Sequence, residues 1–295
     1  MKIHVKMWHH ALWNLVQMDS REEWDQLDVV SKWLIATRSA VTVVTIYSCV
    51  IAGLIAWRDG YFSWAPWLIV TLGLFIAHGT NNLLNDLTDY AREVDQGNYF
   101  RMAYGVHPLV QGFWSRRQQI RWLVISGVLA LASGVYALFY TDFAAVIIGL
   151  FLFGALMLIF YTWPLKYYAL GELLIFLIWG PVMISGVYLV LSRGWVDTAC
   201  LAALAGVPFG LSVASINIGK HIDKLEADAA RGVGTLPVRL GEQAARLANI
   251  TVLILAYLVI LYLVFIPRYF TPALLLVFLA GRRFMLAVGV HARQI

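Results

Sequence analysis

The chain has 295 residues, of which 61% are hydrophobic and 13% are charged, and its formal net charge is +5. Soluble domains carry about 25% charged residues, so this composition excludes an ordinary soluble protein and indicates an integral membrane protein. The two cysteines lie within apolar runs and are too few for a disulfide framework or a thiolate zinc site. We expect no nucleic-acid partner.

The first 33 residues are polar and rich in tryptophan, unlike the basic and then apolar pattern of a cleavable signal peptide. We expect residues 1–33 to form an amphipathic segment on the cytoplasmic surface of the membrane. Tryptophan side chains favour the depth of the lipid headgroups. The tryptophans expected there are Trp8, Trp13, Trp24 and Trp33.

Apolar runs long enough to cross a bilayer occupy most of the remaining chain. The candidate spans are residues 34–57, 64–85, 120–140, 143–163, 169–192, 196–218, 245–266 and 272–290. Only helices and closed barrels satisfy backbone polar groups in lipid, and runs this continuous favour helices. The predicted fold is an all-α, polytopic transmembrane helical bundle of about eight to nine spans. No interior stretch resembles a linker, so residues 34–295 are predicted to form one membrane domain.

A first polar cluster follows the second candidate span, in NNLLNDLTDYAREVD. Helical spacing places Asn82, Asn85 or Asp86, and Asp89 on one face, and Asp95 follows beyond the expected helix end. Carboxylate and amide oxygens are ligands for hard divalent cations, and through such a cation for a phosphorylated ligand. A solvated helix end is the plain alternative, but it does not require amides within the apolar run.

A second polar cluster follows the sixth candidate span, in GKHIDKLEAD. Asp223 and Asp228 are five residues apart, which separates them on an ideal helix, so a bulge or loop is needed to bring them together. An electrostatically balanced loop is an equal alternative. Lys220, Lys224 and Arg239, the last beyond a glycine-containing turn, are placed to clamp phosphate oxygens.

Basic residues are concentrated in the connections after the second, fourth and sixth spans. By the positive-inside rule these connections face the cytoplasm. Both polar clusters then open on the cytoplasmic side, and we expect them to form one active site there, in a protein of a prokaryotic cell membrane.

The two clusters resemble the aspartate-rich motifs of the UbiA superfamily of intramembrane prenyltransferases. NDLTDYAREVD resembles the first motif, and DKLEADAARGVGTLPVRLG resembles the second. A third stretch, YTWPLKYYALGE at residues 161–172, is similar to a pattern of the dihydroxynaphthoate branch, the menaquinone-pathway enzymes. Arg38 stands where the family has a basic residue, and Ser39 replaces the usual proline. The resemblance covers residues 34 to beyond 245.

This resemblance implies a Mg²⁺-dependent transfer of the isoprenyl group of a polyprenyl diphosphate to a small lipophilic acceptor within the bilayer. The implied acceptor is an aromatic quinone precursor such as 1,4-dihydroxy-2-naphthoate. The implied metal ligands are Asn82, Asn85, Asp86, Asp89, Asp223 and Asp228, and the four aspartates are also the implied catalytic residues. The implied diphosphate-binding residues are Arg38, Lys166, Lys220, Lys224 and Arg239. Candidates for binding the acceptor or the prenyl group are His78, Tyr161, Tyr168, Glu172 and Asn217.

Two features depart from the family pattern. Lys224 stands where close relatives place an aspartate, and GRRFMLAVGVHARQI replaces the expected connection and ninth span. Because the motifs do not reveal the residues that line the acceptor pocket, a UbiA-type transferase with a carotenoid, chlorophyllide, haem or lipid-linked sugar acceptor is an alternative. An ion-coupled carrier is another, because intramembrane carboxylates also mark cation pathways. A non-catalytic relative that serves as a partner is the third.

Overall fold

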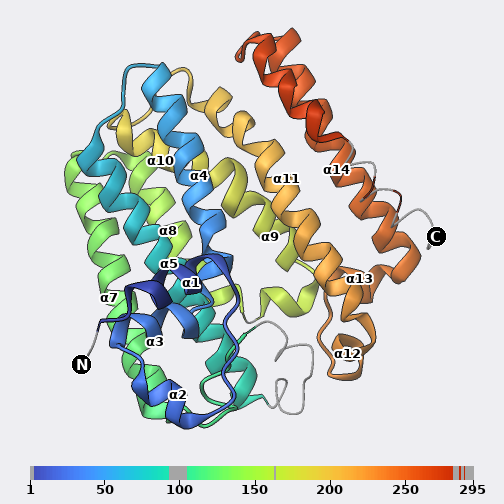
Figure 1. Ribbon diagram of the computed structural model, residues 1–295. Coiled ribbons are helices and arrows are strands. Elements are labelled where there is room, and N and C mark those ends of the chain that lie inside the picture. Colours follow the sequence, from blue (N-terminus) through green and yellow to red (C-terminus); the bar gives the residue numbers. More distant parts are fainter. Residues whose placement is uncertain (1–2, 93–104, 163, 282–285, 287–288, 290–295) are drawn as a thin grey trace. The chain divides into compact units, whose positions relative to one another are not determined.

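The computed structural model describes residues 3–92, 105–162 and 164–281, together with residues 286 and 289 (Figure 1). Every regular element in this part of the chain is helical, which confirms the predicted all-α fold. Six helices are long and apolar enough to cross a membrane. They are α4 (Ser39–Arg58), α5 (Trp64–Ala91), α7 (Arg116–Tyr140), the continuous α9, η2 and α10 (Gly171–Leu191), α11 (Ala199–Asp223) and α14 (Glu242–Phe265).

The two other candidate spans have shorter helices. At the fourth lies α8 (Ala145–Phe160), a helix of 16 apolar and small residues. The eighth begins as the 3₁₀ helix η3 (Pro272–Ala280), and most of its remaining residues lie outside the described part. The bundle is therefore polytopic, with six full-length spans and the shorter apolar helix α8 among the described residues.

The chain divides into two compact units, and the division passes through α4 between Tyr47 and Ser48. Unit 1 contains residues 1–47 and 63–163, and unit 2 contains residues 48–62 and 164–295. The first polar cluster belongs to unit 1 and the second belongs to unit 2.

In unit 1, α5 and α7 pack along each other, and three short helices pack near the ends of this pair (Figure 1). These are α1 (Val5–Trp13), α2 (Arg21–Gln26) and α3 (Val29–Ala36). Trp24 is only 1% exposed, stacks on Phe113 and meets the edge of Trp114. Trp24 is thus enclosed by aromatic partners within the protein, and its depth in the membrane stays a prediction. Trp13, by contrast, is exposed.

Asp28 joins the start of α3 to α1. Its buried carboxylate caps α3 by accepting hydrogen bonds from the backbone of Val30 and Ser31, and it also accepts from the Trp8 indole at 2.9 Å and the His4 backbone at 3.0 Å. Burial alone would raise the pKa of Asp28, but the hydrogen bonds from Ser31, Trp8 and His4 outweigh burial and hold this pKa well below its usual range. The carboxylate is thus a charged tether for the N-terminal segment.

In unit 2, α11 is packed against α9 (Gly171–Leu177), η2 (Ile178–Val182), α10 (Met183–Leu191) and α14 (Figure 1). Three glycines allow the backbones of two of these helices to touch. A Cβ on Gly206 would lie 2.7 Å from the Gly180 carbonyl oxygen, and one on Gly210 would lie 2.4 Å from the carbonyl oxygen of Phe176. Pro181 interrupts the helix at this crossing, and Ser48 donates a hydrogen bond to the Trp179 carbonyl there.

Another part of unit 2, where α4 ends, contains a polar network. Arg58 donates to Asp59 and to the carbonyl oxygen of Tyr269, and its guanidinium lies 4.0 Å from the centre of the Tyr269 ring. The Tyr188 hydroxyl donates to Asp59 at 2.9 Å. The network connects residues at the end of α4, in α10 and after α14.

Candidate functional site

The first polar cluster lies on the last turns of α5, which continues as a helix to Ala91. The predicted helical face is present: the Asn85 side-chain amide donates to a carboxylate oxygen of Asp89, one turn later, at 3.0 Å. Asp86 is fully buried and Asp89 is 3% exposed. Two buried carboxylates therefore lie within one turn of a membrane helix. Asp95 lies outside the described residues.

Arg38 contacts one of these acids, Asp86, from the junction between α3 and α4. Its Nη2 lies 3.0 Å from Asp86 Oδ1 and donates to the backbone carbonyl oxygen of Asn82 at 3.4 Å. The side chain of Arg38 is only 11% exposed, so a buried cation faces a buried anion. The sequence pointed to both residues but not to their pairing.

The main chain at this junction is held against α5. The Asn82 side-chain amide donates to the Thr37 carbonyl oxygen at 2.7 Å, and the Thr37 and Ser39 hydroxyls hydrogen-bond at 2.9 Å. Gly79 allows the close approach, since a Cβ there would lie 3.1 Å from the Thr37 methyl group. Arg38 itself has φ of 55°, in the left-handed region that arginine rarely adopts. The fold thus imposes a costly backbone conformation on this arginine.

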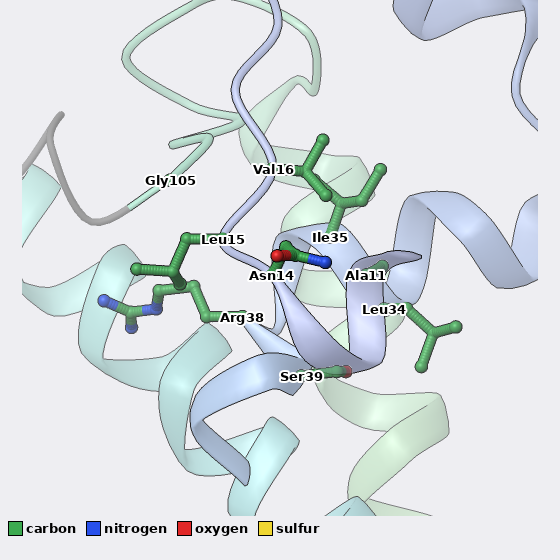
Figure 2. A pocket seen from close by; sticks show the side chains of 9 residues that line it. All are labelled: Ala11, Asn14, Leu15, Val16, Leu34, Ile35, Arg38, Ser39 and Gly105. Carbon is green, nitrogen blue, oxygen red and sulfur yellow. The ribbon is translucent and has the colours of Figure 1, made fainter. Parts of the chain in front are cut away.

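A small pocket adjoins Arg38 (Figure 2). Figure 2 shows the Arg38 guanidinium pointing away from Leu34 and Ser39. The pocket is lined by Ala11, Asn14, Leu15, Val16, Leu34, Ile35, Arg38, Ser39 and Gly105. The N-terminal segment therefore forms a wall beside the arginine that contacts the first cluster.

Two of the expected acceptor- or prenyl-binding residues lie in unit 1. His78, in α5, hydrogen-bonds through Nδ1 with the Thr45 hydroxyl at 2.8 Å, and Tyr161 is the half-buried residue that ends α8. Asn81 joins α5 to the end of α8, because its side-chain amide donates to the Leu158 carbonyl oxygen at 2.9 Å. His78 lies two turns before Asp86 on α5.

In unit 2 the second cluster is divided by a break in the helix. α11 ends at Asp223, Lys224 is its C-terminal cap, and α12 (Leu225–Ala230) follows. Asp223 is exposed, whereas Asp228 is only 5% exposed. Asp228 Oδ1 lies 3.6 Å from Lys224 Nζ, and its Oδ2 lies 3.0 Å from His221 Nδ1. The two aspartates thus have different environments.

His221 is a residue that the set of expected site residues omits. The available signal was its position on the same helical face as Asp228, seven residues away. The other expected cations of unit 2 are less enclosed: Lys220 is half-buried and Arg239 is exposed. Arg239 lies against the turn before α13 (Leu236–Leu240), because a Cβ on Gly234 would be 3.1 Å from Arg239 Nε.

Glu172 is the most unusual acid of unit 2. It lies in the first turn of α9 and is 4% exposed. Its carboxylate faces backbone N–H groups, its own and that of Leu236, and neither oxygen has a well-aligned hydrogen bond among the described residues. The buried Asn217 amide nitrogen is likewise unpaired within that part of the chain. Buried polar atoms without partners are costly, so they are candidates to bind a ligand. Tyr168 is 66% exposed, and the Lys166 side chain lies outside the described residues.

The chemistry of the first cluster fits Mg²⁺. Its donors are the carboxylates of Asp86 and Asp89 and the amide oxygen of Asn85, all of them hard oxygen ligands. Among the described residues no group of three or more His, Cys, Asp or Glu side chains is arranged as a metal site. Ligands for such an ion would therefore have to include the amide, water or the substrate's own oxygens, which is usual for Mg²⁺.

Comparisons with known proteins agree with these features. A sequence model described as the UbiA prenyltransferase family matches residues 46–294. The 1,4-dihydroxy-2-naphthoate octaprenyltransferase of Escherichia coli is 24% identical over 228 residues, 75% of this chain and 72% of the relative. Human UbiA prenyltransferase domain-containing protein 1 is 25% identical over 199 residues, 66% of this chain and 56% of the relative.

A solved structure described as a digeranylgeranylglyceryl phosphate synthase in membranes has a similar fold. Its TM-score is 0.54 at 21% sequence identity, with 88% of this chain and 85% of that chain covered. At this identity the likeness concerns the fold.

Proposed function

Because this chain belongs to the UbiA prenyltransferase family, we propose that it transfers the isoprenyl group of a polyprenyl diphosphate to an aromatic quinone precursor such as 1,4-dihydroxy-2-naphthoate, with Mg²⁺ as cofactor. The observation that supports this most is the pair of buried carboxylates, Asp86 and Asp89, on the last turns of α5. A membrane helix rarely buries two acids one turn apart unless they bind something. The similarity to the naphthoate enzyme of E. coli supports the acceptor class.

The residues of unit 1 have distinct proposed roles. Asp86, Asp89 and the oxygen of Asn85 are the ligands that would hold Mg²⁺, and the hydrogen bond from the Asn85 amide fixes the orientation of Asp89. When bound, Mg²⁺ would neutralise charge on the departing diphosphate. Arg38 would donate hydrogen bonds to diphosphate oxygens with its planar guanidinium. Asn82 holds the main chain next to Arg38 in place through Thr37.

In unit 2 we propose that Lys220, Lys224 and Arg239 attract the diphosphate as cations. Asp223 and Asp228 remain proposed metal ligands, but Asp86 and Asp89 are better placed for this role. Asp223 is exposed, and Asp228 already contacts Lys224 and His221. By the positive-inside rule, the ends of α5 and α11 that carry the polar clusters would face the cytoplasm.

Glu172 is the proposed contact for the acceptor. A buried carboxylate without a well-aligned hydrogen bond suits a ligand that brings a hydroxyl donor, which an aromatic hydroxy acid does. We propose that Asn217 binds the acceptor in a similar way, through its unpaired amide nitrogen. His78 and Tyr161 remain candidates for contacts with the prenyl chain or with the allylic cation, which an aromatic face would stabilise.

The test is turnover by the full chain purified into lipid nanodiscs. Radiolabelled geranylgeranyl or longer polyprenyl diphosphates are supplied with a panel of acceptors that includes 1,4-dihydroxy-2-naphthoate, with Mg²⁺ or with EDTA. We expect a prenylated naphthoate only with Mg²⁺. Diphosphate release with another acceptor would correct the acceptor class, and turnover that persists in EDTA would contradict the metal site.

Variants of the buried acids connect this activity to the site. Asp86→Asn and Asp89→Asn should each lower kcat by roughly a hundredfold or more, the scale typical for lost electrostatic stabilisation of a departing anion. Asp19→Asn, which neutralises an exposed acid of the same unit, is the matched control and should leave kcat unchanged. Full activity in either buried variant would remove it from the ligand set.

A further inference from the structure

We propose that Arg38 occupies Asp86 until a diphosphate arrives, so that the first polar cluster takes up its divalent cation together with the diphosphate and not before it. This inference rests on the proposed function and adds an order of binding to it. In this scheme Arg38 competes with the cation for the Asp86 carboxylate and then moves to the substrate. Arg38, Asp86 and the residues that hold them all belong to unit 1.

The ion pair between Arg38 and Asp86 is almost completely buried. Asp86 is fully buried, the Arg38 side chain is 11% exposed, and their closest atoms are 3.0 Å apart. Water therefore does little to screen either charge. A divalent cation that binds Asp86 in this state would meet the guanidinium at close range, and the repulsion between two positive charges would oppose its entry.

A diphosphate would offer Arg38 a second anionic partner. Its oxygens match the fork of N–H donors on a guanidinium, so they offer Arg38 an alternative partner at least as good as one carboxylate. Once Arg38 turns to the diphosphate, Asp86 becomes available to a cation. The diphosphate also brings negative charge of its own, which favours the cation further. Each ligand should therefore strengthen the binding of the other.

Only the side chain of Arg38 has to move for it to pass from Asp86 to the diphosphate. Its backbone is fixed by the hydrogen bond from Asn82 to the Thr37 carbonyl and by the hydroxyl pair of Thr37 and Ser39. A small pocket adjoins the Arg38 side chain on the side of α1 (Figure 2). A fixed backbone that carries a long side chain with several rotatable bonds is suited to a transfer between two anionic partners.

Two substitutions of Arg38 test this proposal. Arg38→Gly removes the charge and suits the backbone, because glycine adopts a φ of 55° without steric cost. Arg38→Lys keeps a positive charge but loses the planar fork. Arg117→Gln, at an exposed arginine of α7 in the same unit, is the control for the loss of one positive charge. Asp86→Asn shows the result when the carboxylate itself is lost.

The first measurement is the affinity for Mn²⁺ alone, from the electron paramagnetic resonance signal of the free ion. We expect Arg38→Gly to bind Mn²⁺ about tenfold more tightly than the unaltered protein, the scale of one contact to a charged group. Arg117→Gln should match the unaltered protein, and Asp86→Asn should bind less tightly. Equal or weaker Mn²⁺ binding by Arg38→Gly would overturn the proposal.

The second measurement is the affinity for geranylgeranyl thiodiphosphate, an analogue that transfers its prenyl group slowly, at saturating Mn²⁺. Here we expect the opposite sign: Arg38→Gly should bind the analogue about tenfold more weakly, and Arg38→Lys should lie between it and the unaltered protein. Unchanged affinity for the analogue in Arg38→Gly would overturn the transfer of Arg38 to the substrate. If neither Mn²⁺ nor the analogue binds any of these proteins, the proposed function itself fails.

Discussion

His221 Nδ1 lies 3.0 Å from a carboxylate oxygen of Asp228, across the break that separates α11 from α12. The other carboxylate oxygen lies 3.6 Å from the Lys224 ammonium. One buried aspartate thus joins the end of one helix to the start of the next. Asp228 therefore has a structural role, whether or not it also binds a ligand.

Asp228→Asn should therefore destabilise unit 2. The amide has nearly the same shape but lacks the negative charge that faces Lys224, so we expect a loss of about 2 kcal/mol in the free energy of unfolding. The double variant Asp228→Asn with Lys224→Met should recover part of that loss because no buried ammonium remains. Thermal unfolding in detergent measures the stability of the single and the double variant. A double variant no more stable than the single one would show that Lys224 and Asp228 are not coupled.

Gly206→Ala should also lower stability, for a steric reason. The added methyl group would lie 2.7 Å from the Gly180 carbonyl oxygen, so two helices that touch through their backbones would have to separate. We expect a cost of about 1–3 kcal/mol, as for other overpacked sites. Gly154→Ala in α8 is the matched control, since nothing lies within 4 Å of its Cβ position. Equal melting temperatures for the two variants would contradict the close crossing.

Arg58→Lys tests the polar network at the end of α4. Lysine keeps the charge but cannot donate to Asp59 and to the Tyr269 carbonyl with one planar group. We expect a loss of about 1 kcal/mol in the free energy of unfolding, small because the side chain is partly exposed. Prenyl transfer at saturating substrate should be unchanged. A large loss of activity without a change in stability would give this network a part in catalysis.

The N-terminal segment should respond to pH through Asp28. A carboxylate whose pKa is lowered by folding stabilises the folded state above its unfolded pKa, about 3.9, and this contribution is lost as the pH falls through the folded pKa. Hydrogen exchange of residues 3–36 should therefore stay protected from pH 7 to about pH 4 and increase only below that range.

Asp28→Asn should expose the same segment to exchange even at pH 7, because the charged acceptor for Trp8 and His4 is gone. Asp25→Asn, which changes an exposed acid three residues earlier, is the control and should leave protection unchanged. Protection in Asp28→Asn equal to that of the unaltered protein would mean that apolar packing alone holds the segment.

Local sequence patterns were sufficient for part of the site. The contact between Asn85 and Asp89 follows from their helical spacing. The same spacing of polar residues predicted that the first polar cluster is helical, as it is in α5. Similarly, glycines in the second motif predicted the turn between α12 and α13, where Gly232 has φ of 68°. In these cases the geometry is set by residues close together in the chain.

Other features depend on residues far apart, and the sequence could not predict them. Arg38 reaches Asp86 because its backbone is left-handed, a conformation that Thr37, Asn82 and Gly79 impose together. Trp24 is buried because Phe113 and Trp114 surround it, and composition alone could not predict these contacts. The pairing of His221 with Asp228 depends on the break after Asp223, which no glycine or proline marks.

The left-handed backbone at Arg38 also has a consequence for directed evolution. A non-glycine residue in that conformation costs on the order of 1 kcal/mol, which glycine at position 38 would recover. The same substitution would leave the buried Asp86 carboxylate without its cation, and that loss costs more than the backbone strain. A selection for heat resistance alone should therefore retain Arg38, so that stability and activity favour the same residue at this position.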